Sequence, residues 1–149
     1  MADAKADAMA SRVAQAMLSR EGTGPAWQLA IEEARLGYAR VRMTGRADMA
    51  NGHGMIHGGM IFALADTAFA YACNGRNVAA VAASATIAFL SPARIGETLV
   101  AEAVEKAREG RSGVYAVAVR SGDGRAIAEF HGVSREIGGA IVDPPEDNE

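Results

Sequence analysis

The stretch from Asn51 to Asn74 joins a glycine-rich entry to a long apolar run that carries one acid, Asp66. Over 57–74, apolar residues fall on nearly every side of a helical projection, which predicts a helix of about five turns. Asn74 and Gly75 are expected to end this helix through a residue in the left-handed region. Because a helix that is apolar nearly all round must be covered by other elements, the fold is expected to be built around it.

The segments around this helix have the patterns of β-strands. Alternating or β-branched runs between turn residues predict six strands, at 28–33, 38–44, 78–90, 98–107, 113–120 and 126–135. The first two are expected to form a hairpin, and the last three to form consecutive antiparallel hairpins. One antiparallel sheet wrapped around the long helix is the simplest α+β architecture that covers it.

The strand predicted at 78–90 is rich in alanine, so its helix and strand propensities are similar and the alternation decides for a strand. This alternation places Val81, Ile87 and Phe89 on one face and Ser84 on the other. The small alanine side chains are expected to let the long helix lie close to the sheet.

Length and composition fit one folded domain. The chain has 149 residues, 50% of them hydrophobic and 22% charged, which is enough to bury a core. An amphipathic helix is expected over 4–20, within an N-terminal helix and connector at 1–24 that precede the main domain at 25–138. The acidic tail at 139–149 is expected to be disordered.

Charge and cysteine content argue against several functional classes. A net charge of −3 with scattered Lys and Arg argues against a nucleic-acid surface. The lone Cys73 excludes an intramolecular disulfide and reads as a small core residue. Since no secretory signal or membrane span is recognisable either, a cytoplasmic protein is expected.

Asp66 has Phe62 and Ala63 one turn before it and Phe69 and Ala70 one turn after it. A carboxylate in such surroundings costs free energy unless it is hydrogen-bonded. One interpretation is a structural acid that caps a neighbouring loop. The other is a catalytic nucleophile or general base.

Gly58 and Gly59 stand where the helix is expected to begin. Free N–H groups and the positive end of the helix dipole suit a developing negative charge there, although a tight turn explains the glycines equally well. Eight residues of helix separate Gly58 from Asp66 by roughly 12 Å, too far for both to act on one carbonyl. If both are catalytic, the two groups come from different chains, which predicts a homodimer with shared active sites.

His53 and His57 are four residues apart, a spacing that zinc ligands can have, but no third ligand is near them. No metal site is therefore predicted, and His57 is expected to orient the loop before Gly58. The glycine-rich entry also lacks the Lys-Ser/Thr of a P-loop and the glycine spacing of a dinucleotide-binding motif.

The block HGGMIFALADTAFAYACN, with Asn51 upstream and SATIAFLSPARIGE downstream, resembles the hotdog-fold acyl-CoA thioesterases of the phenylacetate-pathway (PaaI) type. The resemblance extends from about Ala30 to Gly138. It implies a hotdog fold with a long helix wrapped by an antiparallel sheet, and dimers paired into tetramers. It also implies hydrolysis of a thioester between CoA and an aryl-acetyl group without a metal or organic cofactor.

Carried over by position, the family's catalytic acid falls on Asp66 and its oxyanion-binding N–H on Gly58, which follows His57. The family's loop asparagine falls on Asn51, and its water-positioning hydroxyl on Ser84. The family arrangement takes Asn51 and Gly58 from one protomer and Asp66 and Ser84 from the other, in agreement with the distance argument.

Other assignments are less specific. Basic residues near turns are candidates for the CoA phosphates, namely Arg94, Lys106, Arg108 and Arg111. Met60, Phe62 and Tyr71 are candidate pocket walls, and these residues do not distinguish a phenylacetyl group from a hydroxyphenylacetyl, benzoyl or medium-chain acyl group. A non-catalytic acyl-CoA-binding hotdog module and a hotdog enoyl-CoA hydratase are the alternative functions.

Overall fold

The computed structural model describes residues 3–146. Its helices are α1 (Ala4–Arg20), α2 (Thr23–Trp27) and α3 (Gly58–Asn74), with a short 3-10 helix η1 (Ala47–Met49) before α3. Its strands are β1 (Ala30–Arg35), β2 (Tyr38–Thr44), β3 (Ala80–Phe89), β4 (Thr98–Glu109), β5 (Ser112–Ser121) and β6 (Ala126–Glu136). The six strands form one antiparallel sheet in the order β1-β2-β4-β5-β6-β3.

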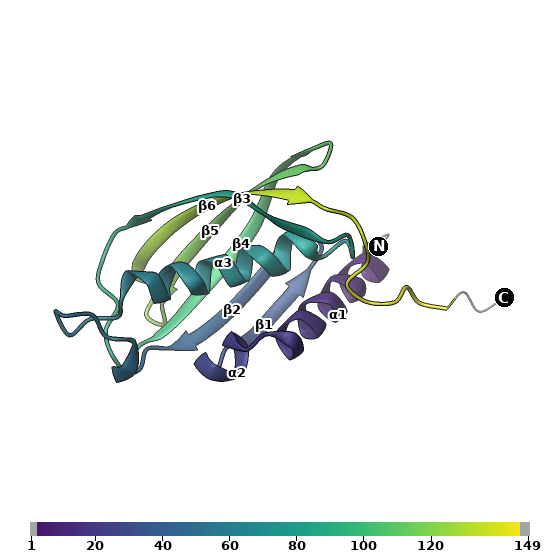
Figure 1. Cartoon of the computed structure of the whole chain (residues 1–149). Helices are drawn as coiled ribbons and strands as arrows, with labels where there is room; N and C mark the ends of the chain where they lie inside the picture. Colours follow the sequence, from purple (N-terminus) through teal and green to yellow (C-terminus); the bar gives the residue numbers. More distant parts are fainter. Residues whose placement is uncertain (1–2, 147–149) are drawn as a thin grey trace.

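The sheet curves around α3, and α1 lies beside β1 at one end of it (Figure 1). The predicted α+β hotdog architecture and N-terminal helix are confirmed. Helix α2 was not expected, because Gly24 and Pro25 read as a break. None of the helices described in residues 3–146 is long and apolar enough to cross a membrane.

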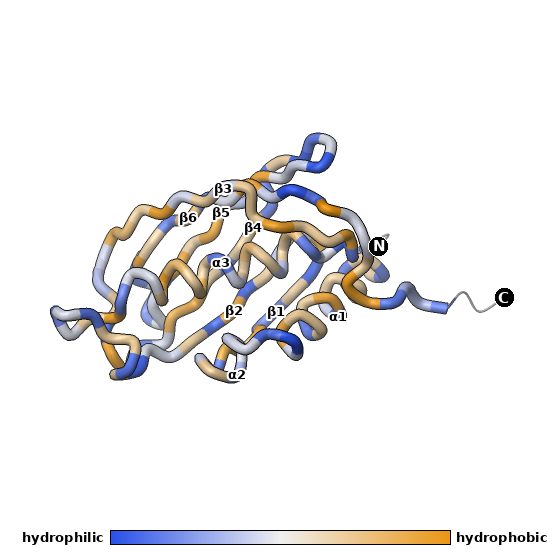
Figure 2. The backbone as a smooth tube through the Cα atoms, in the orientation of Figure 1, coloured by the Kyte–Doolittle hydropathy of each residue, from blue (hydrophilic) through white to orange (hydrophobic). Residues whose placement is uncertain are grey.

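Helix α3 packs on the sheet through Phe69, whose ring lies 5.4 Å from that of Tyr115 and 5.8 Å from that of Phe130. Gly132 on β6 makes this approach possible, because a Cβ there would lie 2.8 Å from the Phe69 ring. Apolar residues run along α3 and the strands beneath it, whereas the β4–β5 turn is strongly hydrophilic (Figure 2). The close packing of Phe69 on the sheet thus requires a glycine at position 132.

The expectation that α3 is covered on all sides is wrong for a single chain. The sheet-facing residues, such as Leu64 and Ala68, have no exposed surface. The opposite face is only half-buried and comprises Phe62, Ala63, Asp66, Thr67 and Ala70. One chain therefore leaves a stripe of α3 open, and the predicted catalytic acid lies on it.

The predicted faces of β3 are wrong on one side of a bulge. Ala82 pairs with Ser134 and Ser84 with Val133, so Ala83 is an extra residue in the strand. The bulge reverses the alternation, since Val81 shares a face with exposed Arg135, whereas Ile87 lies opposite buried Phe130. Val81 is consequently 48% exposed, while Ile87 packs on the core.

The end of α3 also differs from the prediction. Gly75 has a φ of −62° and is not left-handed, whereas Asn77, two residues later, has a φ of +63°. The Asn77 side chain accepts the N–H groups of Ile141 and Val142, both at 2.9 Å. Asn tolerates the left-handed region better than most residues, so Asn77 takes the left-handed conformation that was expected at the end of α3.

The segment after Gly138 lies along the N-terminal helix. Arg12 and Arg20 of α1 donate hydrogen bonds to the carbonyls of Asp143 and Ile141. The predicted disorder of 139–149 and the predicted domain bounds stay predictions, and residues 147–149 of that tail lie outside the described residues.

Candidate active site

A groove of about 340 Å³ lies where α3 begins. It is formed by the loop before α3, the first turn of α3 and the segment after β3. Its lining residues are Asn51, Met55, Ile56, Gly58, Ile61, Phe89, Leu90, Ser91, Pro92 and Ala93. The groove brings Asn51 and Gly58 together, and it is mostly apolar.

His57 is the N-cap of α3, and its ring Nδ1 accepts the N–H of Gly59 at 2.8 Å. The His57 carbonyl accepts the N–H groups of Met60 and Ile61 at 2.9 and 3.3 Å. Within residues 3–146, the N–H of Gly58 is the one first-turn donor left without a partner. His57 thus accepts the N–H groups of the residues after Gly58 and leaves the Gly58 N–H at the groove, which is compatible with its predicted role in orienting this loop.

Phe89 lies directly over the start of α3. A Cβ added to Gly58 would lie 3.1 Å from Phe89 Cζ and 3.3 Å from Phe89 Cε1. The Phe89 ring is 54% exposed and lines the same groove. The sequence did not single out this residue, because only the β3–α3 packing places it beside Gly58.

Asn51 shapes the loop before α3. Its Oδ1 accepts the N–H groups of His53 and Met55 at 2.9 and 3.1 Å, and its own N–H donates to the Met55 carbonyl. Within the described chain, its amide NH₂ group makes no hydrogen bond, so these donors face no protein acceptor. Asn51 can therefore hold the loop and still donate to a bound molecule.

Asp66 lies two turns further along α3, outside this groove. Desolvation by burial raises the pKa of its carboxyl group above the ordinary range, and among residues 3–146 no hydrogen bond stabilises the charged form. The alternative of a structural cap on a neighbouring loop therefore has no support within one chain. A poorly solvated carboxylate is a stronger base.

Comparison with known proteins places these residues in a family. Residues 53–128, which contain Gly58 and Asp66, match the model of the thioesterase superfamily. The chain is 43% identical over 129 residues to the acyl-coenzyme A thioesterase PaaI of Escherichia coli, covering 87% of this chain and 92% of that protein. The chain belongs to the thioesterase superfamily.

Solved structures agree with this thioesterase assignment. The structure of the E. coli PaaI protein from the phenylacetic acid degradation operon matches with a TM-score of 0.88 and 41% identity, covering 90% of this chain and 97% of that one. The TT0310 protein of Thermus thermophilus matches with a TM-score of 0.76 and 37% identity, covering 79% and 99%. The resemblance to PaaI-type hotdog thioesterases is confirmed.

The structure of this thioesterase does not join Ser84 to Asp66 within one chain. Ser84 is exposed, follows the β3 bulge and pairs with Val133, on the strand face opposite to Ile87. No hydrogen bond links it to Asp66 among the described residues. Its predicted role in positioning water stays a prediction.

The basic residues of the thioesterase fall into two groups. Arg94 is exposed and follows Ala93 at the groove. Lys106, Arg108 and Arg111 lie around the β4–β5 turn, at the other end of α3 (Figure 1). Arg108 is already paired with Glu136 at 2.8 Å. Of the four candidates, one chain therefore places only Arg94 near Gly58.

The remaining candidates have structural surroundings. Tyr71 is buried, and its hydroxyl donates to Glu21 at 3.0 Å, so it belongs to the core and not to the groove. Burial raises the pKa of the Cys73 thiol to about 12. Among residues 3–146, no group of three or more His, Cys, Asp or Glu side chains is placed to hold a metal ion.

Proposed function

We propose that this thioesterase hydrolyses aryl-acetyl-CoA thioesters of the phenylacetyl type to the free acid and CoA. The observation that carries the proposal is the Gly58 N–H, which has no acceptor among residues 3–146 and lies at an apolar groove, on the same helix as a desolvated Asp66. The acyl-CoA class follows from the name of the E. coli relative, and the aryl-acetyl group from the operon of its matching structure.

In the proposed reaction, the Gly58 N–H donates to the thioester carbonyl and stabilises the oxyanion that forms. A main-chain donor of this kind contributes about 3 kcal/mol or more to the barrier reduction. Asp66 either takes a proton from the water that attacks the carbonyl carbon, or attacks that carbon itself to give an anhydride, which water then hydrolyses to the free acid. In both routes the C–S bond breaks, and the departing CoA sulfur takes up the proton that the water loses. This chemistry requires no metal or organic cofactor.

The two groups are proposed to meet across a homodimer. Eight helical residues separate Gly58 from Asp66 by roughly 12 Å, so they serve one carbonyl only if Asp66 comes from a second chain. In the part of the chain that the structure describes, no strand pairs with the outer edge of β3, and Val81, Phe89 and Leu90 on or just after it are 48–57% exposed. Pairing two such edges covers these side chains and the open stripe of α3. The proposed assembly is a dimer of such dimers.

In this assembly, Asn51 and Ser84 are proposed to hold the attacking water from opposite protomers. Arg94, and in the assembled protein Lys106, Arg108 and Arg111, are proposed to bind the CoA phosphates. A cytoplasmic location is part of the proposal, because the single Cys73 is buried as a free thiol.

Replacement of Asp66 by Asn tests the assignment. We expect kcat for thiol release from phenylacetyl-CoA to fall by roughly 10²–10⁴-fold with little change in KM, since the amide cannot act as a base. Asp48→Asn is the matched control, because Asp48 is an exposed carboxylate outside the groove. The circular dichroism spectrum of both variants should match the wild type.

Turnover at the wild-type rate in a folded Asp66→Asn variant would refute the catalytic role of Asp66. A parallel thiol-release screen over aryl and alkyl CoA esters tests the substrate class. If short alkyl esters are hydrolysed faster than phenylacetyl-CoA, the aryl-acetyl assignment is wrong and the thioesterase assignment stands.

A further inference from the structure

The loop between β3 and β4 forms a wall of the groove without belonging to the sheet. Ser91, Pro92 and Ala93 line the groove, and the loop continues to Glu97 before β4 begins. We propose that Arg125 is a positioning residue that fixes this loop and, through it, the Gly58 N–H donor. The inference rests on the oxyanion role proposed for Gly58.

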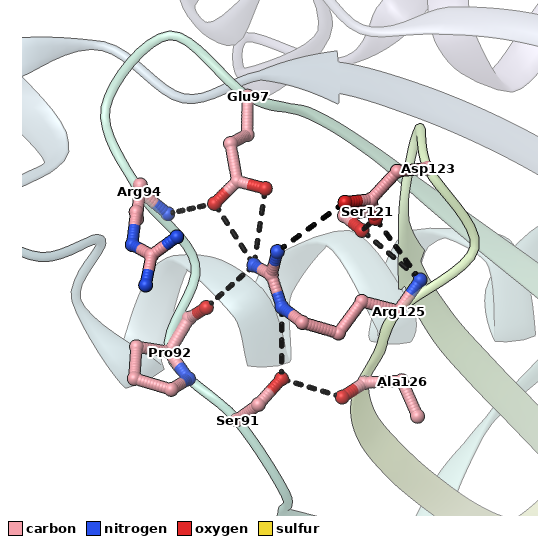
Figure 3. Close-up of polar contacts among 8 residues, drawn as sticks. All are labelled: Ser91, Pro92, Arg94, Glu97, Ser121, Asp123, Arg125 and Ala126. Carbon is pink, nitrogen blue, oxygen red and sulfur yellow. Dashed lines mark hydrogen bonds and ion pairs between the residues drawn. The ribbon is translucent and has the colours of Figure 1, made fainter.

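Arg125 joins both ends of the loop through one guanidinium (Figure 3). Its Nη2 donates to the Pro92 carbonyl at 2.9 Å and to the Glu97 carboxylate oxygens at 2.9 and 3.0 Å. Its Nε donates to Ser91 Oγ at 3.3 Å, and that hydroxyl donates to the Ala126 carbonyl at 2.6 Å. The planar donor fork of Arg suits this set of acceptors, and a Lys has only one donor atom to offer.

The Glu97 carboxylate also connects the β3–β4 loop to the loop before α3. Glu97 Oε1 also accepts the N–H of Arg94 at 2.7 Å, and Arg94 forms an isolated antiparallel bridge with Met55. The adjacent Ala93 carbonyl accepts the N–H of Ile56 at 2.9 Å. Ile56 is buried and lies two residues before Gly58, so the start of α3 is held to the loop that Arg125 fixes.

Arg125 is itself held in place by the β5–β6 turn. Its main-chain N–H donates to Asp123 Oδ1 at 3.1 Å and to Ser121 Oγ at 3.2 Å, and Ser121 Oγ bonds Asp123 in turn (Figure 3). The hydrogen bond from Arg125 lowers the pKa of Glu97, because it stabilises the charged carboxylate. The sheet thus supplies a rigid anchor for two loops that have few ladder bonds of their own.

The test compares Arg125→Gln, Arg125→Lys and Glu97→Gln with Arg40→Gln. Arg40 pairs with Glu32 at 2.7 Å, with side-chain exposures of 34% and 25%, close to the 31% and 21% of Arg125 and Glu97, and it lies outside the groove. Steady-state kinetics use an acyl-CoA that the wild type hydrolyses. Amide hydrogen exchange at Ile56, followed by NMR, reports the loop directly and independently of turnover.

We expect Arg125→Gln and Glu97→Gln to lower kcat roughly tenfold with KM changed less than about twofold, because a displaced donor acts on the transition state. Exchange at the Ile56 amide should be roughly tenfold faster, with Arg125→Lys between these variants and the wild type. Arg40→Gln should match the wild type in both measurements.

Unchanged kcat and unchanged Ile56 exchange in Arg125→Gln would overturn the proposal. If that variant does not fold, Glu97→Gln and Arg125→Lys give the same decision. If the wild type releases no thiol from any CoA ester, the proposed function fails, and the Ile56 exchange rates alone decide whether Arg125 positions the loop.

Discussion

At the scale of single residues, Asp66 is a carboxyl group whose surroundings disfavour its charged form. Its carboxyl group is half-buried on α3, and in the described chain no hydrogen bond compensates the lost hydration. The pKa of Asp66 is therefore raised by desolvation, which makes it a better base and a poorer contributor to stability.

This leads to a pH-dependent prediction for the free energy of unfolding. When a carboxyl group has a higher pKa in the folded chain than in the unfolded chain, the unfolded chain ionises first as pH rises. The free energy of unfolding therefore falls as pH rises from the ordinary Asp pKa through the folded value. Asp66→Asn removes that loss. Its melting temperature should therefore exceed the wild-type value at pH 8, with a gain that shrinks as pH is lowered towards 4.5. Scanning calorimetry across this range measures it, and a lower melting temperature for the variant at pH 8 would contradict the desolvation argument.

At the scale of elements, the first turn of α3 combines a capping residue, His57, with the proposed oxyanion donor, Gly58. His57 accepts the N–H groups of Gly59, Met60 and Ile61, and in residues 3–146 the Gly58 N–H has no acceptor. Gly58 is the first helical residue, a position where proline is tolerated, and His57 has a ψ of 135°, which suits a residue before proline.

Two substitutions at this position test the donor. Gly58→Pro removes the N–H, and Gly58→Ala adds a Cβ against Phe89 but keeps the N–H. We expect kcat to fall roughly 10²–10³-fold in the proline variant and less than about tenfold in the alanine variant, since one oxyanion donor is lost only in the first. Steady-state thiol release measures both. Equal losses in the two variants would assign the effect to crowding by the Cβ.

The elements differ in how far the sequence determines them. The range of α3 was predicted within one residue, because its apolar pattern extends over four turns and more. The faces of β3 were predicted wrongly on one side of the bulge, because the extra residue at Ala83 depends on pairing with β6, some fifty residues later. Asn77 likewise replaced Gly75 as the left-handed residue, because its side chain finds partners in a distant segment.

The sequence likewise indicated some residues of the candidate site and not others. The resemblance named Gly58, Asn51 and Asp66, and the structure supplies a free donor, a loop bond and a desolvated acid at these positions. The sequence did not indicate Arg125, because an Arg after a turn that contains glycines has no distinctive pattern. Its contacts appear only where the β5–β6 turn packs against the β3–β4 loop (Figure 3).

At the scale of the whole molecule, the proposed mechanism assigns two half-sites to each chain, one at Gly58 and one at Asp66. The proposed dimer predicts complementation between Asp66→Asn and Gly58→Pro, each nearly inactive alone. After subunit exchange at equal concentrations, half of the dimers are mixed, and each mixed dimer has one intact site, so activity should return to roughly a quarter of wild type. Thiol release measures the recovery, with labelled subunits to prove exchange. No recovery despite exchange would place both groups in one chain.

The strand order also has a consequence during synthesis of the chain. Strand β3 pairs only with β6, which follows every other strand described here. While the ribosome is still making β4 and β5, β3 has no neighbour on either side, and its exposed apolar residues have no cover. If two chains pair through their β3 edges as proposed, we therefore expect this pairing to begin only after β6 has emerged from the ribosome.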